Sequence, residues 1–234
     1  MTHAARIALV VACGAGGACG SSLEAAPADK APRKSLVRIG DPLCVTRGTA
    51  QVGAMVDRPT VRAVAPGTSG DAAALEFVIR GETPTVHELA DGEARRQLGL
   101  KLRARDGCNL VYVMWRLDPR PKLEVSVKRN PGEKTHEACG ADGYTKVKAK
   151  KSSPVPALEP GVKHTLRAEI DGSALTAWID DRVVWRGALP EEAAELAGPA
   201  GIRSDNLSFD LVGFSAAAGV TGAAISKCKR DESD

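Results

Sequence analysis

Residues 159–172 read Glu-Pro-Gly-Val-Lys-His-Thr-Leu-Arg-Ala-Glu-Ile-Asp-Gly, and they open the part of the chain that decides the fold. From His164 to Ile170 polar side chains alternate with the histidine and with apolar residues, which is the period of a strand with one buried face. Asp171-Gly172 supplies the positive backbone angle of a tight hairpin, and residues 175–185 hold two further short strands around a turn at Asp180-Asp181. This stretch predicts an antiparallel meander.

Residues 97–129 predict a second meander. Apolar and polar residues alternate from Leu98 to Arg105, Asp106-Gly107 turns the chain, and residues 109–117 then carry apolar side chains on both faces. A strand that is apolar on both faces belongs in the middle of a sheet. Outside the meanders, residues 190–196 begin with proline and two acids, which predicts one short helix. The expected class is all-β with one short helix.

Composition narrows the range of functions that the chain could have. The 234 residues suit one β-domain with flanking segments, and only three Trp, three Phe and two Tyr are present to line a binding surface. The formal charge of +3 is small, and the basic residues are spread among 29 acidic ones, so we expect no nucleic-acid partner. The four histidines form no close pair of the kind found in zinc sites, and we expect no metal or other cofactor.

The first residues resemble a secretory signal. A basic start is followed by the apolar residues 7–12, and Val10-Val11-Ala12-Cys13 resembles the lipobox of bacterial lipoproteins, in which the cysteine is acylated. We therefore expect Cys13 to carry a lipid, although an ordinary cleaved signal with an incidental cysteine is the alternative. Gly14 after the cysteine, rather than Asp, resembles the pattern for sorting to the outer membrane where a bacterium has two membranes.

These features divide the chain into four expected segments. They are a signal peptide (1–12), a flexible Gly-, Ala- and Pro-rich tether (13–35), a β-domain (36–218) and a C-terminal tail (219–234). The expected location is the bacterial envelope, where the exported protein meets the membrane through its lipid anchor.

The β-domain resembles the concanavalin A-like lectin/glucanase superfamily, including its laminin-G-like and keto-disaccharide-hydrolase-like members. The resemblance rests on residues 164–169 with the turn at Asp171-Gly172, on Trp178-Ile179-Asp180, on residues 201–206 and on Phe209-Asp210. It implies a two-sheet antiparallel jelly-roll sandwich whose first and last strands adjoin. The fold hosts binders, hydrolases and structural modules, so it does not select a function.

Four cysteines are expected to form disulfides in an exported chain. We prefer Cys108 with Cys139, which would hold the long loop expected over residues 130–156. We also prefer Cys44 with Cys228, which would join the two ends of the sandwich. Free or differently paired thiols are the alternative.

The sequence offers a candidate binding face and no catalytic signature. The Glu-x-Asp-x-x-Glu strand of the glucanases is absent, since Ala174 stands where its last Glu would follow Glu169 and Asp171. If the strands of the second meander pair in sequence order, one polar face collects Lys101, Arg103, Arg105, Tyr112, Arg116, Glu124, Ser126 and Lys128. Cationic side chains beside a tyrosine suit a carbohydrate, including an anionic glycan, and Arg103, Arg105, Tyr112, Arg116 and Lys128 are the candidate ligand-binding residues.

Other interpretations of the chain remain open. This face could instead be a solvated surface whose long basic side chains cover apolar area. The leading hypothesis is a lipid-anchored, exported carbohydrate-binding module. A glycoside or keto-disaccharide hydrolase and a structural envelope protein without ligand are the alternatives.

Overall fold

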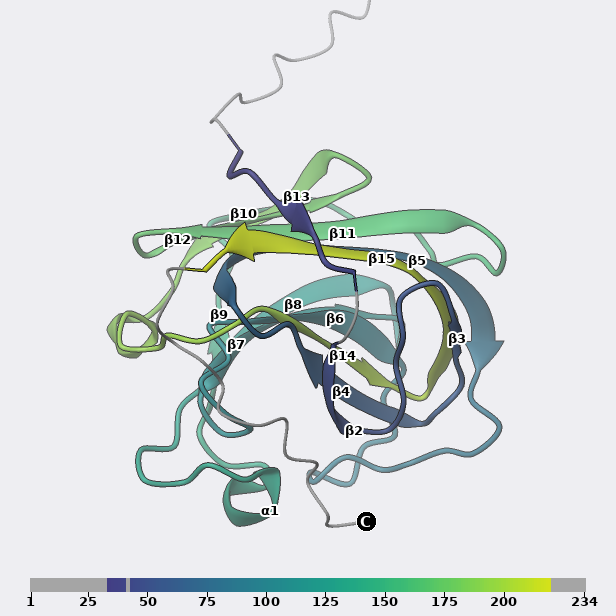
Figure 1. Ribbon diagram of the computed structural model, residues 1–234, viewed down its shortest axis with the longest axis horizontal. Helices are drawn as coiled ribbons and strands as arrows, with labels where there is room; N and C mark the ends of the chain where they lie inside the picture. The colour runs from purple at the N-terminus through teal and green to yellow at the C-terminus, as the bar shows by residue number, and fades with distance from the viewer. Residues whose placement is uncertain (1–32, 41–42, 220–234) are drawn as a thin grey trace, which may run out of the picture. The chain divides into compact units, whose positions relative to one another are not determined.

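A computed structural model describes residues 33–40 and 43–219, which form a sandwich of two antiparallel β-sheets (Figure 1). The eight-stranded sheet has the order β1-β15-β5-β11-β12-β13-β10, with β3 paired to β15. Its strands are β1 (Val37–Arg38), β3 (Met55–Val56), β5 (Thr68–Glu82), β10 (Lys151–Ser152), β11 (Lys163–Asp171), β12 (Ala174–Ile179), β13 (Arg182–Ala188) and β15 (Leu207–Ala218). The first described strand, β1, pairs with the last, β15, as the jelly-roll expectation requires.

The seven-stranded sheet has the order β2-β4-β14-β6-β7-β8-β9. Its strands are β2 (Cys44–Arg47), β4 (Thr60–Val64), β6 (Gln97–Leu102), β7 (Leu110–Arg116), β8 (Lys122–Lys128), β9 (Tyr144–Val147) and β14 (Gly201–Asp205). Every residue of β7 is buried, in agreement with the central position expected from its two apolar faces. Both expected meanders, β6-β7-β8 and β11-β12-β13, are present, so the all-β prediction is confirmed.

Local sequence explains the hairpins of the first meander. Asp171 pairs with Ala174, so the loop between β11 and β12 has two residues, and Gly172 takes the positive φ of 58° that this tight turn needs. Asp180 and Asp181 also have positive φ, at 48° and 63°, between β12 and β13. Asp and Asn tolerate this conformation better than most residues, which explains their place in the turn.

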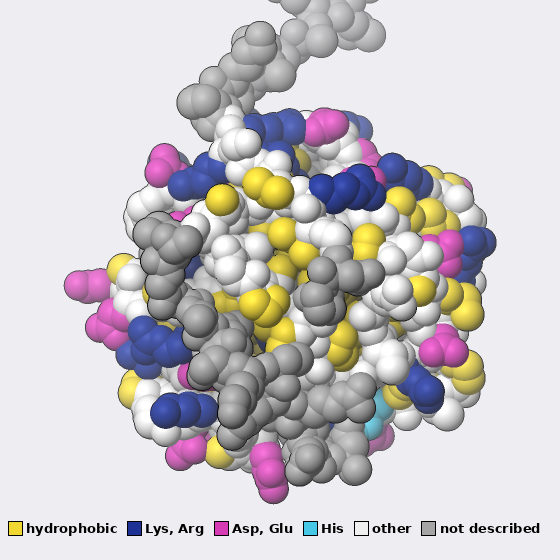
Figure 2. All heavy atoms as spheres, in the orientation of Figure 1, with side chains coloured by type: hydrophobic (Ala, Val, Ile, Leu, Met, Phe, Trp, Pro, Cys, Tyr) yellow, Lys and Arg dark blue, Asp and Glu magenta, His cyan; other side chains and the backbone are white. Residues whose placement is uncertain are grey.

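The core lies between the two sheets. Phe77 from the eight-stranded sheet meets Trp115 from the seven-stranded sheet edge to face, with ring centroids 5.9 Å apart and no exposed area on either side chain. His164 packs against both rings, and its Nδ1 is 2.8 Å from Asp180 Oδ2, so the histidine is a hydrogen-bonded core residue. In Figure 2 hydrophobic side chains gather in the middle of the view, between the layers of Figure 1.

Two expectations need correction. Residues 130–156 are not one long loop: they contain helix α1 (His136–Cys139), and they add β9 to the edge of one sheet and β10 to the edge of the other. Conversely, the helix expected over 190–196 is a single 3-10 turn, η1 (Glu191–Ala193). Alternation is weak in short edge strands, and a proline followed by acids suits either kind of helical turn.

Cysteine pairing is described for one predicted pair. Cys108 and Cys139 form a disulfide, with Cα atoms 6.0 Å apart. Cys44 is also a disulfide cysteine, whereas its preferred partner Cys228 lies outside the described residues, as do Cys13 and the expected signal peptide. Among the described residues no helix is long and apolar enough to cross a membrane.

Candidate functional site

The seven-stranded sheet turns a polar face away from the core. Register places Lys101, Tyr112, Ser126 and Lys146 opposite one another across β6, β7, β8 and β9, so these four side chains form one row on this face. Arg62 and Arg203 lie opposite each other on β4 and β14 and continue the face beyond β6. We call this surface the polar face.

A buried ionic cluster anchors the polar face. Asp205 has no exposed area, and it accepts hydrogen bonds from Arg62 Nη2 at 2.7 Å, Arg203 Nε at 2.8 Å and Gln97 Nε2 at 2.7 Å. Burial by itself would raise the pKa of Asp205, but the two guanidinium groups outweigh it and hold that pKa well below its usual range. Two arginines share this one carboxylate, so the cluster keeps a positive charge.

Two tyrosines stack beside this cluster. The rings of Tyr112 and Tyr144 are 6.1 Å apart at an angle of 19°, and the guanidinium of Arg203 lies 4.8 Å from the centre of the Tyr112 ring. Arg203 Nη1 also donates a hydrogen bond to the Tyr144 hydroxyl at 3.2 Å. Burial raises the pKa of Tyr112 to about 12. Tyr112 is 3% exposed and Tyr144 is 38% exposed, so Tyr144 presents its ring to solvent while Tyr112 supports it.

The segment that contains α1 crosses part of the polar face. In Figure 1 α1 lies on the side of the seven-stranded sheet that faces away from the other sheet. The Cys108–Cys139 disulfide ties the segment to the start of β7, and the buried Lys128 donates from Nζ to the Gly140 carbonyl at 2.7 Å. Burial, followed by the charges of Arg203 and Arg62, lowers the pKa of Lys128 to about 8.

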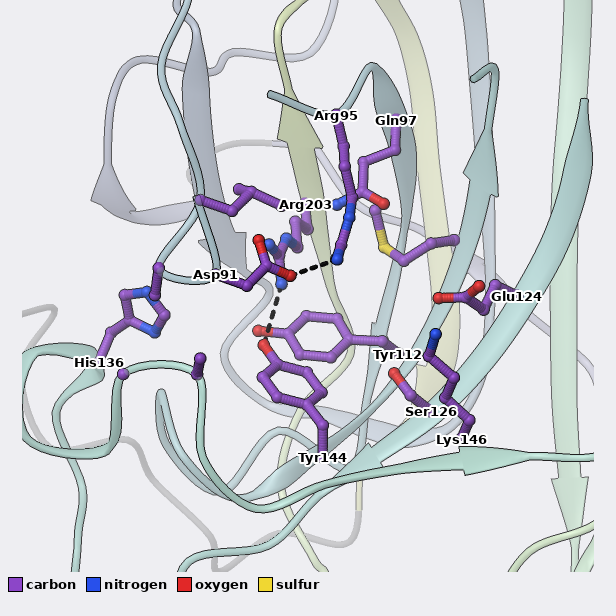
Figure 3. Close-up of a pocket in the computed structure, with 15 residues that line it drawn as sticks. Asp91, Arg95, Gln97, Tyr112, Glu124, Ser126, His136, Tyr144, Lys146 and Arg203 are labelled. Atoms are coloured by element: carbon purple, nitrogen blue, oxygen red, sulfur yellow. Dashed lines mark hydrogen bonds and ion pairs between the residues drawn. The ribbon is translucent and has the colours of Figure 1, made fainter. Parts of the chain in front are cut away.

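Two cavities open on the polar face, one on each side of His136 and Tyr112, which line both. The first, the tyrosine cavity, has a volume of about 160 Å³ and is shown in Figure 3. Its side chains combine an aromatic surface with hydrogen-bonding groups, and they include Asp91, Arg95, Gln97, Tyr112, Glu124, Ser126, Tyr144, Lys146 and Arg203. The second, the cationic cavity, has a volume of about 220 Å³, and its lining includes Thr46, Arg47, Arg62, Lys101, Tyr112 and Glu137.

Figure 3 shows how the tyrosine cavity is arranged. The Tyr112 and Tyr144 rings lie one against the other with their hydroxyls directed toward Arg203 and Asp91. Glu124, Ser126 and Lys146 lie on the opposite side of the rings from His136. A ligand in this cavity would therefore meet an aromatic surface with donors and acceptors on either side of it.

The structure brings together only part of the predicted site. Tyr112 lines both cavities. Arg116 and Lys128 lie on the same face, but both are nearly inaccessible: Arg116 pairs with Glu124 and Glu93, and Lys128 is covered by the Tyr144 ring and the α1 segment.

Arg103 and Arg105 do not share this face, contrary to the expected alternation. Strand β6 ends at Leu102, and Arg103 turns the chain with a φ of 46° and donates to Asp71 in the other sheet. Arg105 donates to the Glu195 carbonyl near η1. The two arginines therefore lie at the end of the sandwich, outside the lining of either cavity.

Sequence reasoning missed Arg62, Arg203, Asp205 and Tyr144. In residues 201–205 the charged Arg203 and Asp205 alternate with Ile202 and Ser204, a pattern that could have indicated a charged face opposite the core. Tyr144 lies in the stretch expected to be a loop, next to Gly143, and nothing in its neighbours indicated an edge strand.

The carboxylates of the tyrosine cavity are paired with cations. Asp91 forms an ion pair with Arg95, and Glu124 accepts from Lys122 Nζ at 2.8 Å. Burial works against ionisation of Glu124, yet Lys122 and Arg116 lower its pKa overall. A general acid for glycoside cleavage needs a raised pKa, so Glu124 suits hydrogen bonding better than acid catalysis. Within the described residues no group of His, Cys, Asp and Glu is placed to hold a metal ion.

Comparisons with known proteins return structural likeness only. No protein-family model and no curated protein sequence matches the chain. Among solved structures it is similar to the carbohydrate-binding module CBM66 from Bacillus subtilis, with a TM-score of 0.43 and 13% identity over 80% of this chain and 94% of that one.

Two further structures show a comparable likeness. A tetrameric galectin from the ball sponge Cinachyrella sp. gives a TM-score of 0.44 and 14% identity over 68% of this chain and 99% of that one. A protein of unknown function with a galectin-like fold from Bacillus subtilis gives a TM-score of 0.45 and 10% identity over 73% and 80%. The fold assignment itself rests on the strands and register described above.

Proposed function

We propose that this protein is an exported, lipid-anchored carbohydrate-binding module and that a sugar ring occupies the tyrosine cavity. The observation that carries the proposal is Tyr144, which is 38% exposed, stacks on Tyr112 and borders a cavity of about 160 Å³. A sugar ring has an apolar C–H surface and a rim of hydroxyls that donate and accept. Tyr144 would contact the C–H surface, and Gln97, Glu124 and Arg203 would meet the hydroxyls.

Preorganisation supports this assignment. Tyr144 is held by the hydrogen bond from Arg203 and by Lys128, whose Nζ lies 4.9 Å from the centre of the ring. Arg203 is fixed by Asp205. Side chains that are already held lose little conformational entropy when a ligand binds, so such a surface binds more tightly than one made of mobile side chains.

Export and anchoring rest on the sequence. The lipobox-like Val10-Val11-Ala12-Cys13 motivates the anchor, and the Cys108–Cys139 disulfide supports export because disulfides persist in oxidising compartments. Labelling with a radioactive fatty acid tests the anchor: the full chain should take up label, and Cys13→Ser should not. Equal labelling of both proteins would overturn the lipid assignment.

A glycan array read against a matched pair of variants tests the binding function. We expect the chain to bind a subset of the glycans and Tyr144→Ala to weaken that binding about tenfold, the effect of losing one aromatic contact. Met55→Ala is the control, because Met55 is 60% exposed but lies on the eight-stranded sheet. The absence of binding to every glycan, or equal losses in both variants, would contradict the proposal.

A further inference from the structure

The tyrosine cavity contains a row of side chains that runs across four neighbouring strands. Register places Arg203 on β14 opposite Gly99 on β6. On the other side of Gly99 follow Met114 on β7 and Glu124 on β8. Arg203, Met114 and Glu124 all line the cavity. Because Gly99 has no side chain, the row consists of a cation, a thioether and a carboxylate, with the apolar group in the middle.

Met114 forms an apolar spot between the two charged groups. Its side chain lies over Gly99, since a Cβ atom at position 99 would come within 2.9 Å of the Met114 Sδ. Met114 is 5% exposed, and Leu89 and Ala90, from the loop before β6, line the same cavity. Thioethers pack well against small apolar groups, so a methyl group of a ligand can be buried here.

Arg203 keeps one donor group for a ligand. Its Nε donates to Asp205 at 2.8 Å and its Nη1 to the Tyr144 hydroxyl at 3.2 Å, whereas no described residue accepts from its Nη2. The residue is 6% exposed and lines the cavity, and these two bonds fix the direction of the remaining N–H groups. Buried donors are normally hydrogen-bonded, so this Nη2 calls for a ligand or water in the cavity.

Glu124 keeps one acceptor on the other side of Met114. Lys122 Nζ at 2.8 Å and Arg116 Nη1 at 3.4 Å both contact its Oε2, and no described residue donates to its Oε1. Burial works against ionisation of Glu124, but Lys122 and Arg116 lower its pKa overall, so the carboxylate is charged and can only accept. Figure 3 shows Arg203 and Glu124 on either side of the cavity.

We infer that the tyrosine cavity selects a 2-acetamido sugar, whose acetamido group lies along the row from Arg203 to Glu124. The inference rests on the proposed function and names the ligand class of that site. In an acetamido group the carbonyl and the N–H point in opposite directions, and a methyl group ends the substituent. The carbonyl would accept from Arg203 Nη2, the N–H would donate to Glu124 Oε1, and the methyl would pack on Met114. Gln97, the third polar group assigned to the sugar, remains for a hydroxyl.

The spacing of residues along β7 suits a ring and an acetamido group side by side. Tyr112 and Met114 are two residues apart on the same face of this strand, which corresponds to about 7 Å. A ring stacked on Tyr144, beside Tyr112, therefore has Met114 beyond its edge. A hydroxyl ends close to the ring, whereas an acetamido group extends further and ends in a methyl. A sugar with hydroxyls alone would place no apolar group on Met114.

Paired sugars test the inference. Calorimetry with the full chain would compare triacetylchitotriose, a trimer of N-acetylglucosamine, with cellotriose, which carries a hydroxyl in place of each acetamido group. N-acetylgalactosamine and galactose form a second pair with the other configuration at C4. The acetamido member of at least one pair should bind roughly tenfold more tightly or better, because it alone completes both hydrogen bonds and covers Met114. Equal affinities within both pairs, or binding confined to glycans without an acetamido group, would overturn the inference and leave the proposed function intact. The absence of binding to any glycan would overturn both.

Methionine methyl groups report where the acetamido group binds in the unaltered protein. Two of the three methionines, Met55 and Met114, lie among the described residues. In NMR spectra of the chain with isotopically labelled methionine methyl groups, the Met114 signal should shift with the acetamido sugar and not with its hydroxyl counterpart. Met55, which is 60% exposed on the eight-stranded sheet, is the internal control, and Met114→Leu assigns the signal. An unchanged Met114 signal in a chain saturated with the acetamido sugar would overturn the inference.

A pair of variants at Met114 separates the contact with the methyl group from the filling of space. Met114→Gln keeps the length of the side chain but replaces the thioether with an amide, and it should weaken binding of the acetamido sugar about tenfold. Met114→Leu keeps an apolar group of similar volume and should retain most of the affinity. Equal losses in the two variants would mean that no apolar contact is made at this position and would overturn the inference.

Discussion

Charged side chains are arranged differently on the outward faces of the two sheets. On the eight-stranded sheet, Arg80 pairs one-to-one with Asp210 at 2.5 Å in solvent, and the Arg80 side chain is 52% exposed. On the seven-stranded sheet, Arg62 and Arg203 are almost fully buried around Asp205. Exposed pairs contribute little to stability, whereas burying charge is costly and is tolerated where it serves another purpose. The difference marks the polar face as the part of the domain whose chemistry is not explained by folding alone.

The largest effect should follow from removing the shared carboxylate. Asp205→Ala would leave Arg62 and Arg203 buried without a counter-charge, and we expect a loss of about 3–5 kcal/mol in the free energy of unfolding. The matched change Asp210→Ala removes the exposed partner of Arg80 and should leave the urea midpoint almost unchanged. Urea unfolding of both variants measures the contrast. Similar urea midpoints for the two variants would mean that burial of the Arg62–Arg203–Asp205 cluster does not make the stability of the fold depend on its carboxylate.

The next effect concerns the covalent link over the polar face. Cys108 and Cys139 are separated by 31 residues, and a disulfide closing a loop of that length stabilises a fold by about 3–4 kcal/mol. The double variant Cys108→Ser/Cys139→Ser should lose roughly this amount in urea unfolding. Because the α1 segment also covers Lys128 and borders both cavities, glycan affinity should fall in the same protein. Unchanged affinity after loss of the disulfide would show that the segment does not shape the site.

The eight-stranded and seven-stranded sheets also differ in how far the sequence predicts them. The alternation from His164 to Ile170 and the Asp171-Gly172 turn are local signals, and they gave β11 and its hairpin to β12. Alternation from Leu98 onward predicted β6, but it also placed Arg103 and Arg105 in the strand, which ends at Leu102. After β6, Arg103 is held by Asp71 and by the Ala193 carbonyl. Both partners are distant in sequence, so no local pattern indicates where the strand ends.

Membership of the polar face depends on strand order. Tyr112 was predicted as part of this face because β7 pairs with β6 and β8, which are the strands directly before and after it in the chain. Arg203 was not, because β14 inserts between β4 and β6, and no local pattern records that insertion. Tyr144 likewise joins the face only because β9 pairs with β8. The two meanders were predictable from local alternation and the two-sheet sandwich from the family resemblance, whereas most of the candidate site was predicted by neither.

The smallest effect on stability that we predict is a pH dependence that belongs to Lys128. Its pKa falls from the ordinary 10.5 to about 8 in the folded protein, so between these values the unfolded chain binds more protons than the folded one. Stability from this residue therefore rises as pH increases from about 8 to 10.5 and is lost as pH falls back through 8. Allowing for screening by solvent, we expect a change of roughly 2 kcal/mol across that window.

A difference experiment isolates that dependence from other titrating groups. The free energy of unfolding of the wild type minus that of Lys128→Met should grow as pH rises through the window, on top of a constant offset from the lost bond to the Gly140 carbonyl. Lys128→Arg, which keeps its charge at every pH tested, should give the same trend because the wild-type lysine is the group that titrates. A difference that stays flat, or that shrinks as pH rises, would mean that neither burial nor the charges of Arg203 and Arg62 lower the pKa of Lys128 in the folded protein.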